Sequence, residues 1–431
     1  MKTKAQNHIK TRPSKPKAIL VGISMPSSPP AEISLEELAG LVTTAQYNPV
    51  ATLTQRLTEI NPKTFVGSGK VEEIRLAVKH HNPEAVIFDE ELSPRQNREL
   101  ENILKCRVMD RPWVILEIFS DHARTREAKT QVELARMKYA LPRLTGMWGH
   151  LSRQRGGIGM KDVGETQIQL DRRMIRNEIH KLEKKLIQID KEKKTQRKNR
   201  AGTYKVALVG YTNAGKSSLM NCLTGADTLV EDKLFATLDA TVRKIKKNFP
   251  YPVLLSDTVG LINKLPHDLV ASFKSTLDEV RDANLLIHVV DLSHPEYIEQ
   301  MRTADDLLRE MNADDIDIVI AFNKIDALPD METLDRALHA FPSSTGISCQ
   351  TGQGIESLRK QIIYHYEKKL APYRLELDHS QAILVQEIRK VALIIKEDYN
   401  PDGIVLSLRL SLEAKAKLES ILKRSLKTAS G

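Results

Sequence analysis

The sequence is poor in cysteine and in long apolar runs, and each shortage argues against a class of protein. Its 431 residues include only three cysteines, Cys106, Cys222 and Cys349, which lie far apart and form no Cys-x-x-Cys pair. This spacing argues against a disulfide framework and a zinc site, and it fits a reducing, cytoplasmic compartment. No apolar run approaches the roughly 20 residues of a membrane-spanning helix. We therefore expect no membrane span.

The start of the chain resembles a secretory signal because a basic segment, residues 1–17, precedes an apolar one. The apolar segment, Ala18–Ser24, is short, and prolines between Pro26 and Pro30 follow it without a small-residue cleavage site. Secretion is therefore disfavoured. We interpret residues 18–24 as a buried strand.

Positive charge is concentrated in two parts of the chain. The formal net charge is +9, but residues 1–17 carry six lysines or arginines and no acid, and residues 143–205 carry seventeen against seven acids. The remainder is therefore acidic. A basic stripe beside acidic domains favours a polyanion partner that contacts one region. A solvated, lysine-rich helix is the alternative.

Sequence patterns divide the chain into a basic tail, residues 1–17, and four further parts. Short apolar runs alternate with helical patterns over residues 18–112, which predicts an α/β domain with a parallel sheet. The runs are Ala18–Ser24, Ala51–Thr54, Ala85–Phe88 and Arg107–Asp110. Residues 204–370 form a third part. Residues 371–431 contain two strand-like runs, Val391–Lys396 and Ile404–Leu410, around a turn at Asn400–Gly403, and they predict a small α+β domain.

Residues 113–200 carry apolar positions at heptad spacing, which predicts a long antiparallel helical hairpin. Its second helix, of roughly 30 residues, would be ~45 Å long. The connection, residues 146–164, contains six glycines together with Trp148, Arg153, Arg155 and Lys161. Trp148 could stack on an unpaired base, and the basic side chains could hold phosphates or bases. A disordered connector is the alternative, but the basic helices beside this tip favour an RNA-binding role.

A phosphate-binding loop follows the strand-like run Lys205–Gly210. It reads Gly210-Tyr211-Thr212-Asn213-Ala214-Gly215-Lys216-Ser217, and Ser218 lies in the helix that follows. Glycines let the backbone wrap phosphates, and the N–H groups with the helix N-terminus supply positive potential. Lys216 can reach the β- and γ-phosphates, and Ser217 offers Mg²⁺ a hydroxyl ligand.

The choice between guanine and adenine depends on a second motif, Asn323-Lys324-Ile325-Asp326, which follows an apolar strand. The Asp326 carboxylate can accept two hydrogen bonds from guanine, and adenine lacks both donors. Asn323 can bond the O6/N7 edge and brace the phosphate loop, while the Lys324 stem can cover the base. Ser348-Cys349, followed by Gln350, can present a backbone N–H to guanine O6.

Two further segments are typical of nucleotide-dependent switches. Phe235-Ala236-Thr237-Leu238-Asp239 supplies Thr237, the natural second Mg²⁺ ligand, and Asp257-Thr258-Val259-Gly260 supplies a carboxylate for the Mg²⁺ water shell. The Gly260 N–H can sense the γ-phosphate, whose loss frees the following loop. Together the segments predict a Ras-like G domain over residues 204–370. They predict GTP and GDP as ligands and hydrolysis that depends on Lys216, Thr237 and Gly260.

Leu261 occupies the position where Ras-type proteins place a water-orienting glutamine, so we expect slow intrinsic hydrolysis. Asn213 resembles the asparagine with which potassium-dependent G proteins bind K⁺ beside the phosphates. This interpretation predicts faster hydrolysis in K⁺ than in Na⁺. A purely structural role of Asn213 in the loop is the alternative.

Other classes of nucleotide-binding protein share parts of this pattern. A metabolic P-loop kinase would need neither Asn323–Asp326 nor a switch threonine, and an RNA-remodelling ATPase would prefer ATP. A nucleotide-gated RNA-binding scaffold, in which hydrolysis does not matter, stays open because of Leu261.

The motifs and their flanks resemble the HflX-type GTPases over most of the chain. The resemblance depends on segments outside the nucleotide motifs, namely Lys63–Lys70, Val108–Arg111, Gln131–Ala135, Lys138–Leu144, Leu151–Gly159, Gly164–Gln167 and Phe235–Asp239. It implies a cytoplasmic, Mg²⁺-dependent GTPase that binds the large ribosomal subunit and its RNA, with the hairpin tip reaching toward the peptidyl-transferase centre. It also implies a role in splitting or rescuing stalled ribosomes under stress, and we expect a monomer.

The chain departs from the family pattern at three places. It has Lys161-Asp162-Val163-Gly164-Glu165 where Arg-Gly-Pro-Gly-Glu is usual, and Asp239-Ala240-Thr241-Val242 where a proline and a second threonine are usual. It also has Ser348-Cys349 in place of Ser-Ala.

Overall fold

The computed structural model describes residues 15–26, 31–144, 161–198, 203–225, 234–235, 241–245, 249, 251–264, 279–313, 315–389 and 391–428. Contacts divide the chain into two compact units, residues 1–185 with 264–272 and residues 186–263 with 273–431. Among the helices in these ranges, none combines the length and the apolar character that crossing a membrane requires.

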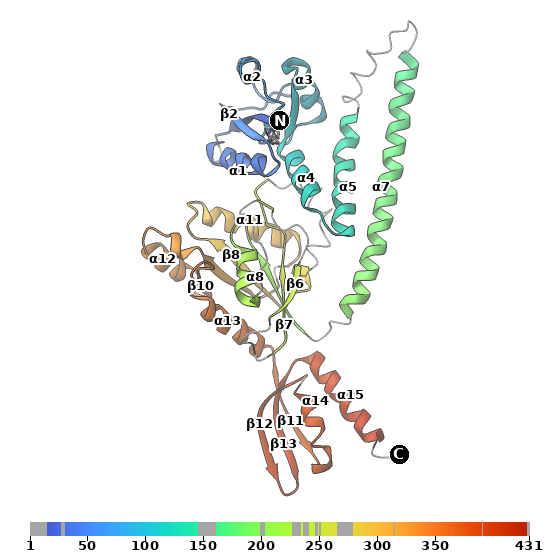
Figure 1. Ribbon diagram of the computed structural model, residues 1–431, viewed down its shortest axis with the longest axis vertical. Helices are drawn as coiled ribbons and strands as arrows, with labels where there is room; N and C mark the ends of the chain where they lie inside the picture. The colour runs from blue at the N-terminus through green and yellow to red at the C-terminus, as the bar shows by residue number, and fades with distance from the viewer. Residues whose placement is uncertain are drawn as a thin grey trace, which may run out of the picture. The chain divides into compact units, whose positions relative to one another are not determined.

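A four-stranded parallel sheet forms the centre of the first unit (Figure 1). Its strand order is β2-β1-β3-β4, and the strands are β1 (Lys17–Ser24), β2 (Asn48–Arg56), β3 (Ala85–Phe88) and β4 (Arg107–Asp110). All four predicted runs lie within these strands. The run at residues 18–24 is a buried strand, because Ala18, Ile19 and Leu20 are fully buried.

One helix follows each strand of this sheet and contacts it, and a further helix and a short 3₁₀ helix continue the chain. They are α1 (Ala31–Thr44), α2 (Ser68–His81), α3 (Pro94–Leu104), α4 (Arg111–His122), α5 (Arg126–Ala140) and the short 3₁₀ helix η1 (Leu141–Arg143). Local sequence fixes their ends. Ser93 and Gln96 form a reciprocal capping box at the start of α3, and Asn82 ends α2 in the left-handed conformation.

Two buried charged residues join the sheet to the helices that follow it. Asp110 is fully buried at the end of β4, and its carboxylate accepts hydrogen bonds from the Trp113 and Leu92 backbones, each at 3.1 Å, and from the Tyr139 hydroxyl at 2.7 Å. Arg143 also donates to it at 3.4 Å. The next residue, Arg111, is equally buried and pairs with Asp89 at 2.7 Å and with Glu37. A buried charge must be paired in this way to be tolerated.

The helical hairpin consists of α5 and α7 (Lys161–Lys198), which run antiparallel (Figure 1). Ile179, Leu182 and Ile189 of the predicted heptad pattern are buried on α7, and Lys138 on α5 pairs with Glu183 on α7 at 3.0 Å. The hairpin is therefore confirmed. With 38 residues α7 is longer than the prediction, because the helix begins within the segment that we assigned to the glycine-rich tip.

The second unit contains a six-stranded mixed sheet of order β10-β9-β8-β5-β7-β6, in which β6 is antiparallel to β7. Its strands are β5 (Tyr204–Val209), β6 (Thr241–Ile245), β7 (Val253–Asp257), β8 (Leu285–Asp291), β9 (Ile318–Asn323) and β10 (Ser344–Gly346). The helices are α8 (Lys216–Thr224), α11 (Tyr297–Glu310), α12 (Glu332–Ala340) and α13 (Ile355–Lys368), with the 3₁₀ helix η2 (Ile325–Ala327). The carboxyl ends of β5, β7, β8 and β9 meet at one edge, where parallel sheets of this kind bind ligands.

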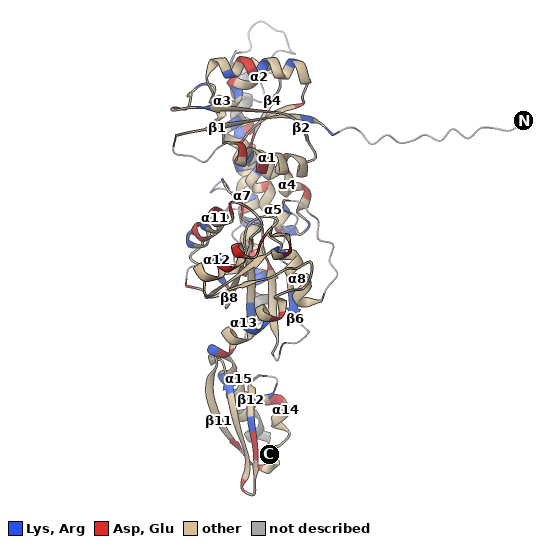
Figure 2. Ribbon diagram, turned by 90° about the vertical axis from the view of Figure 1, so that its left-hand side faces the viewer, with Lys and Arg blue, Asp and Glu red and all other residues tan. Residues whose placement is uncertain are grey.

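Charged residues are placed at helix ends where they interact favourably with the helix dipole. Glu332 and Asp335 lie in the first turn of α12, whereas Lys368 lies in the last turn of α13. In Figure 2 the ribbon of α12 carries the colour of acidic residues, and the end of α13 carries that of basic residues. The adjacent Lys369 pairs with Asp317 at 3.0 Å.

A three-stranded antiparallel sheet of order β11-β13-β12 lies at the C-terminal end of this unit. It consists of β11 (Ala371–Leu377), β12 (Leu393–Asn400) and β13 (Gly403–Leu410), with η3 (His379–Gln381), α14 (Leu384–Ile388) and α15 (Leu412–Thr428). The predicted hairpin around Asn400–Gly403 is confirmed as β12 and β13. The strand β11 was not predicted, because Ala371-Pro372 was interpreted as a break.

Candidate nucleotide site

The phosphate-binding loop between β5 and α8 depends on two glycines. Gly210 has φ +146°, and a Cβ built on it would lie 2.2 Å from the Val289 carbonyl oxygen of β8. Gly215 has φ +94°, and a Cβ there would lie 2.1 Å from Nδ2 of Asn323. Any side chain would therefore push the loop away from β8 and from the end of β9.

Lys216 begins α8, and its side chain is folded against the loop. Only 6% of the residue is exposed, and its Nζ donates hydrogen bonds to the carbonyls of Gly210 at 3.0 Å and Tyr211 at 2.7 Å. Burial lowers the pKa of this ammonium to about 8, and the negative charge of Asp257 opposes that shift. Lys216 thus places a cation beside the backbone that would surround phosphates.

Ser217 and Asp257 bring two oxygen ligands together at the ends of α8 and β7. The Ser217 hydroxyl donates to Oδ2 of Asp257 at 2.6 Å, and Asp257 is 2% exposed. A hydroxyl and a carboxylate at this separation have the hard-oxygen chemistry that Mg²⁺ prefers. The next residue, Thr258, has a different partner, because its hydroxyl donates to the Leu208 carbonyl of β5 at 2.6 Å.

Gly260 and Leu261 lie directly against the phosphate-binding loop. A Cβ on Gly260 would be 3.2 Å from Nζ of Lys216. The Leu261 N–H donates to the Gly210 carbonyl at 3.0 Å, and the Leu261 carbonyl accepts from the Thr212 N–H at 2.8 Å. Leu261 is 6% exposed. The segment after Asp257 is therefore paired with the phosphate-binding loop through its backbone.

Asn323 connects the phosphate-binding loop to the loop that follows β10. Its Nδ2 donates to the Ala214 carbonyl at 2.9 Å, and its Oδ1 accepts from the Cys349 N–H at 3.2 Å. The residue is 2% exposed. One carboxamide at the end of β9 thus holds two loops that are more than one hundred residues apart in sequence.

The other residues of the Asn323–Asp326 motif have their own partners. Lys324 adopts a left-handed backbone, φ +63°, and its ammonium pairs with Asp291 at 2.6 Å. Asp326 is exposed within η2. The sequence reasoning missed Asp291, although its place at the end of the strand beside β9 is the signal that could have found it.

The loop after β10 is held by its own hydrogen bonds. Ser348 is fully buried, and its hydroxyl accepts from the Thr351 N–H at 3.0 Å. Its own N–H donates to the Gln353 carbonyl at 3.0 Å. Cys349 is half-buried and Gln350 is exposed. The structure therefore brings this loop together with Asn323, as one edge of the candidate site.

Several predicted site residues lie outside the described residues. These are Ala236, Thr237, Leu238 and Asp239 of the first switch, and Trp148, Arg153 and Arg155 of the hairpin tip. Phe235 is described and buried, with φ +57°. Lys161 is the first residue of α7, but its side chain is outside the described set.

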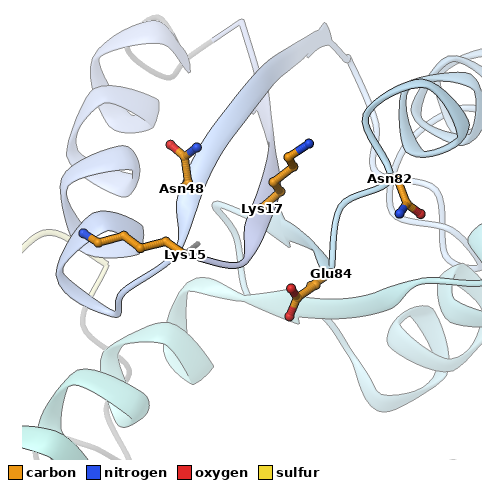
Figure 3. Close-up of a pocket in the computed structure, with 5 residues that line it drawn as sticks. All are labelled: Lys15, Lys17, Asn48, Asn82 and Glu84. Carbon is orange, nitrogen blue, oxygen red and sulfur yellow. The ribbon is translucent and has the colours of Figure 1, made fainter. Parts of the chain in front are cut away.

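A cavity of about 450 Å³ lies in the other unit, away from these loops (Figure 3). It is lined by Lys15, Lys17, Asn48, Asn82 and Glu84. Lys17 and Asn48 begin β1 and β2, so the cavity lies at the amino ends of the parallel strands. Ligands of open α/β sheets bind at the carboxyl ends, and this cavity is not the candidate site.

Comparison with known proteins assigns three segments to family models. Residues 32–120 match a model described as GTP-binding GTPase N-terminal, residues 122–200 match GTP-binding GTPase Middle Region, and residues 205–324 match 50S ribosome-binding GTPase. These matches cover the first unit from residue 32 onward, the hairpin, and the G domain from its first strand through Lys324.

Relatives with the same name are similar over nearly the whole chain. A protein named GTPase HflX from Caldanaerobacter subterraneus subsp. tengcongensis is 40% identical over 414 residues, 95% of this chain and 94% of the relative. The GTPase HflX of Escherichia coli is 41% identical over 391 residues, 90% of this chain and 92% of the relative. Among solved structures, a GTP-binding protein from Sulfolobus solfataricus in complex with GDP is 27% identical, with 82% of this chain and 99% of that chain covered and a TM-score of 0.45.

Proposed function

We propose, from the premise that this chain belongs to the HflX family of GTPases, that it couples GTP binding and hydrolysis to action on the large ribosomal subunit. The chain is a GTPase, and its G domain binds guanine nucleotides. The proposal adds the partner and the task, which is the splitting or rescue of stalled ribosomes under stress. The observation that carries the nucleotide part is the Asn323 carboxamide, which holds the phosphate-binding loop and the loop at Cys349 together.

The phosphates would bind at the loop between β5 and α8. The backbone N–H groups of residues 210–218 and the positive end of α8 would surround them. Lys216, whose ammonium already lies at the loop carbonyls, would exchange those bonds for the β- and γ-phosphate oxygens. The N–H of Gly260, a residue that lies beside Lys216, would report the presence of the γ-phosphate.

A Mg²⁺ ion fits the donor set at the ends of α8 and β7. Ser217 and Asp257 would hold it, directly or through water, and their 2.6 Å contact supports this role. Thr237 would supply a further oxygen when the first switch closes. Bound Mg²⁺ would neutralise charge on the β- and γ-phosphates.

The base would lie between Lys324 and the loop after β10. Asp326 is exposed and can accept hydrogen bonds from guanine N1–H and its 2-amino group. The Asp291 carboxylate fixes the Lys324 ammonium at 2.6 Å, which leaves the lysine stem to cover one face of the base. The Cys349 N–H, which here donates to Asn323, would turn from that bond to donate to guanine O6, and Ile325, Ser348 and Gln350 would shape the rim.

Hydrolysis in this chain needs a group that Leu261 cannot supply. Leucine cannot orient water, and Leu261 is buried with its backbone bonded to the phosphate-binding loop. We therefore propose that the ribosome and a K⁺ ion near Asn213 provide the missing activation. Asn213 is exposed in the loop. Its left-handed backbone, φ +59°, is one that asparagine tolerates, so a structural role is the competing explanation.

The remaining parts of the chain would position the G domain on the ribosome. We propose a basic tail over residues 1–17, an α/β domain over 18–112, a hairpin over 113–200, a G domain over 204–370 and a C-terminal α+β domain over 371–431. The hairpin tip, with Trp148, Arg153, Arg155 and Lys161, would contact ribosomal RNA. The excess of seventeen basic over seven acidic residues in 143–205 supports this assignment.

GTP turnover by the full chain, with and without purified large subunits, tests the proposal. We expect slow turnover alone, stimulation of at least tenfold by large subunits, and faster turnover in K⁺ than in Na⁺ for the wild type but not for Asn213→Ala. Arginine fingers and similar devices give 10³–10⁵ in related systems, so tenfold is a conservative threshold.

Each alternative function has its own outcome in this experiment. A rate unchanged by large subunits, together with nucleotide-dependent cosedimentation, would favour the RNA-binding scaffold. A preference for ATP would favour the RNA-remodelling ATPase. Equal rates in K⁺ and Na⁺ would show that K⁺ takes no part in hydrolysis. The proposed stimulation by large subunits would stand.

A further inference from the structure

Two of the three cysteines meet at the edge of the candidate nucleotide site. Cys222 lies on α8, and Cys349 lies in the loop after β10. The Cys222 thiol donates to the Cys349 carbonyl oxygen at 3.4 Å. Both side chains pack on the apolar core of the six-stranded sheet, and both are half-buried rather than enclosed. A small oxidant in solution can therefore reach them.

We propose that Cys222 and Cys349 are a peroxide-sensitive thiol pair, which forms an intramolecular disulfide that weakens guanine-nucleotide binding. The effect on binding rests on the proposed nucleotide site, but the formation of the disulfide does not.

The charges around the pair favour Cys222 as the reacting sulfur. A hydrogen bond from the Cys349 thiol lowers the pKa of Cys222 to about 7, and the positive charge of Arg359 acts in the same direction. Arg359 is held in place by its hydrogen bond to the Cys222 carbonyl at 3.2 Å. The pKa of Cys349 is raised, first by its hydrogen bond with the Cys222 side chain and then by burial. Thiolates are the nucleophilic form of cysteine.

The reaction balances with one hydrogen peroxide. The Cys222 thiolate attacks one peroxide oxygen, an S–O bond forms, the O–O bond breaks and hydroxide leaves as the sulfenic acid appears. The Cys349 sulfur then attacks the Cys222 sulfur, the S–S bond forms, the S–O bond breaks and water leaves. The two thiols supply two electrons, and the peroxide ends as two waters.

The disulfide would disturb the loop that holds the base. An S–S bond is about 2.05 Å long, so closure draws Cys349 toward α8. The Cys349 N–H bonds to Asn323 at 3.2 Å and, in the proposed complex, to guanine O6. Moving this backbone removes one hydrogen bond to the base, worth ~1–1.5 kcal/mol, so we expect GDP to bind roughly tenfold more weakly.

Thermodynamic linkage between GDP binding and thiol oxidation predicts a second measurable quantity, the reduction potential of the cysteine pair. If the disulfide weakens GDP binding tenfold, saturating GDP must shift the thiol–disulfide equilibrium tenfold toward the thiols. For this two-electron couple, a tenfold change corresponds to about 30 mV. GDP should therefore make the pair easier to reduce by that amount.

The experiment uses the full chain in nucleotide-free and GDP-bound forms. Hydrogen peroxide treatment, blocking of residual thiols with iodoacetamide and digestion without reductant should give a peptide pair joined through residues 222 and 349. Release of a fluorescent GDP analogue should then be roughly tenfold faster and should recover after dithiothreitol. Titration in glutathione buffers with and without GDP measures the shift in potential.

Cys106 offers the matched control for this experiment. It is also half-buried, but burial raises its pKa, and it lies in the other unit. Cys106→Ser should keep the full response to peroxide, and Cys222→Ala should lose it. Failure of excess peroxide to join residues 222 and 349 in the nucleotide-free wild type would overturn the proposal, as would a disulfide that leaves GDP release unchanged. A reduced chain that does not bind GDP would instead contradict the proposed nucleotide site.

Discussion

Asp326 is the residue on which the proposed selection of guanine depends. It lies exposed in η2, directly after Lys324 and Ile325 at the end of β9. The structure fixes the residues that precede it, since Asn323 bonds two loops and Lys324 pairs with Asp291. The backbone that leads into η2 is thus held in place, and the exposed Asp326 carboxylate can turn to a base edge.

Asp326→Asn should change the preferred base. An amide would place a donor against a guanine donor, so GDP affinity should fall by about 2–3 kcal/mol, roughly 30- to 150-fold. The same amide can donate to the 2-oxo group of xanthine, so affinity for xanthosine diphosphate should rise. Calorimetry with both nucleotides measures the two changes.

Asp335→Asn is the matched control for Asp326→Asn. Asp335 is an exposed aspartate on α12, and its substitution removes the same charge without touching the base site. Its GDP affinity should equal that of the wild type. If Asp326→Asn also retained wild-type GDP affinity, the base would not bind at Asp326.

At the level of single residues, the spacing of the motifs could predict which segments lie together at the site, but not every hydrogen-bond partner of their residues. Residues 210–217, 257–260, 323–326 and 348–350 meet because each follows a strand of one sheet. The partners of Thr258 and Leu261 could not be predicted, because they depend on backbone groups of β5 and the phosphate-binding loop. The pairing of Cys222 with Cys349 was also missed, since a contact between a helix and a distant loop leaves no mark in local spacing.

The elements of the first unit explain two of the segments by which the sequence resembles its family. Val108–Arg111 and Lys138–Leu144 contain the buried Asp110 and its partners Tyr139 and Arg143. The Arg143 guanidinium also stacks on the Tyr139 ring at 3.6 Å. Burial raises the pKa of Asp110. These residues join the end of β4 to the last turn of α5 and to η1, so their role in this chain is to fix to the sheet the end of α5 that precedes the hairpin tip.

Element positions were predictable where both the apolar pattern and the turn residues were clear. The strands of the first unit and the hairpin β12–β13 are of this kind. The strand β11 was missed because Pro372 argues against a strand. In the structure β11 is an edge strand paired only with β13, opposite Arg409, and an edge strand tolerates a residue without an N–H.

The strand β8 should become less stable as the pH falls, because it contains a buried neutral histidine. His288 is 2% exposed, and burial, with a further contribution from Lys216, lowers its pKa to about 4 from an ordinary 6.5. Between pH 6.5 and 4 the unfolded chain binds the proton and the folded chain does not. The free energy of unfolding should therefore decrease as pH falls through this window, by up to about 1.4 kcal/mol per pH unit.

Hydrogen-exchange mass spectrometry of peptides within residues 285–291 measures this effect in the whole chain, after correction for the intrinsic exchange rate. His288→Leu keeps an apolar side chain at the position and removes the titrating group. The opening free energy of β8 should fall less steeply with decreasing pH in this variant than in the wild type. Parallel profiles for the two proteins would show that His288 is not the group responsible.

At the scale of the whole molecule, the parts of the chain differ in net charge, and this difference follows their proposed partners. Residues 143–205 are strongly basic, whereas the chain outside this stretch and the first 17 residues is net acidic. The long helix α7 belongs to the basic stretch, and its apolar seam leaves many polar positions exposed, including Arg173. An acidic nucleotide-binding domain would be repelled by RNA, so contact with the ribosome should depend on the hairpin.

Arg153→Ala with Arg155→Ala should weaken binding to the large subunit and leave GDP binding unchanged. Each lost phosphate contact removes about 0.7–0.9 from the slope of log affinity against log salt. The double variant should therefore show a slope smaller by up to about 2. Cosedimentation with large subunits between 50 and 200 mM salt, roughly the range over which such contacts change affinity most visibly, gives this slope.

The control for this pair must remove the same charge from another surface. Arg302→Ala with Arg309→Ala does so on α11, where both side chains are 70% exposed and pair only with neighbours on the same helix in the described part of the chain. This variant should keep the wild-type slope. If both double variants lower the slope equally, the attraction is a property of net charge and the tip is not a specific contact. If neither does, while replacement of residues 146–160 by a flexible linker abolishes binding, the tip acts through Trp148 or its glycine backbone, because stacking on a base depends little on salt.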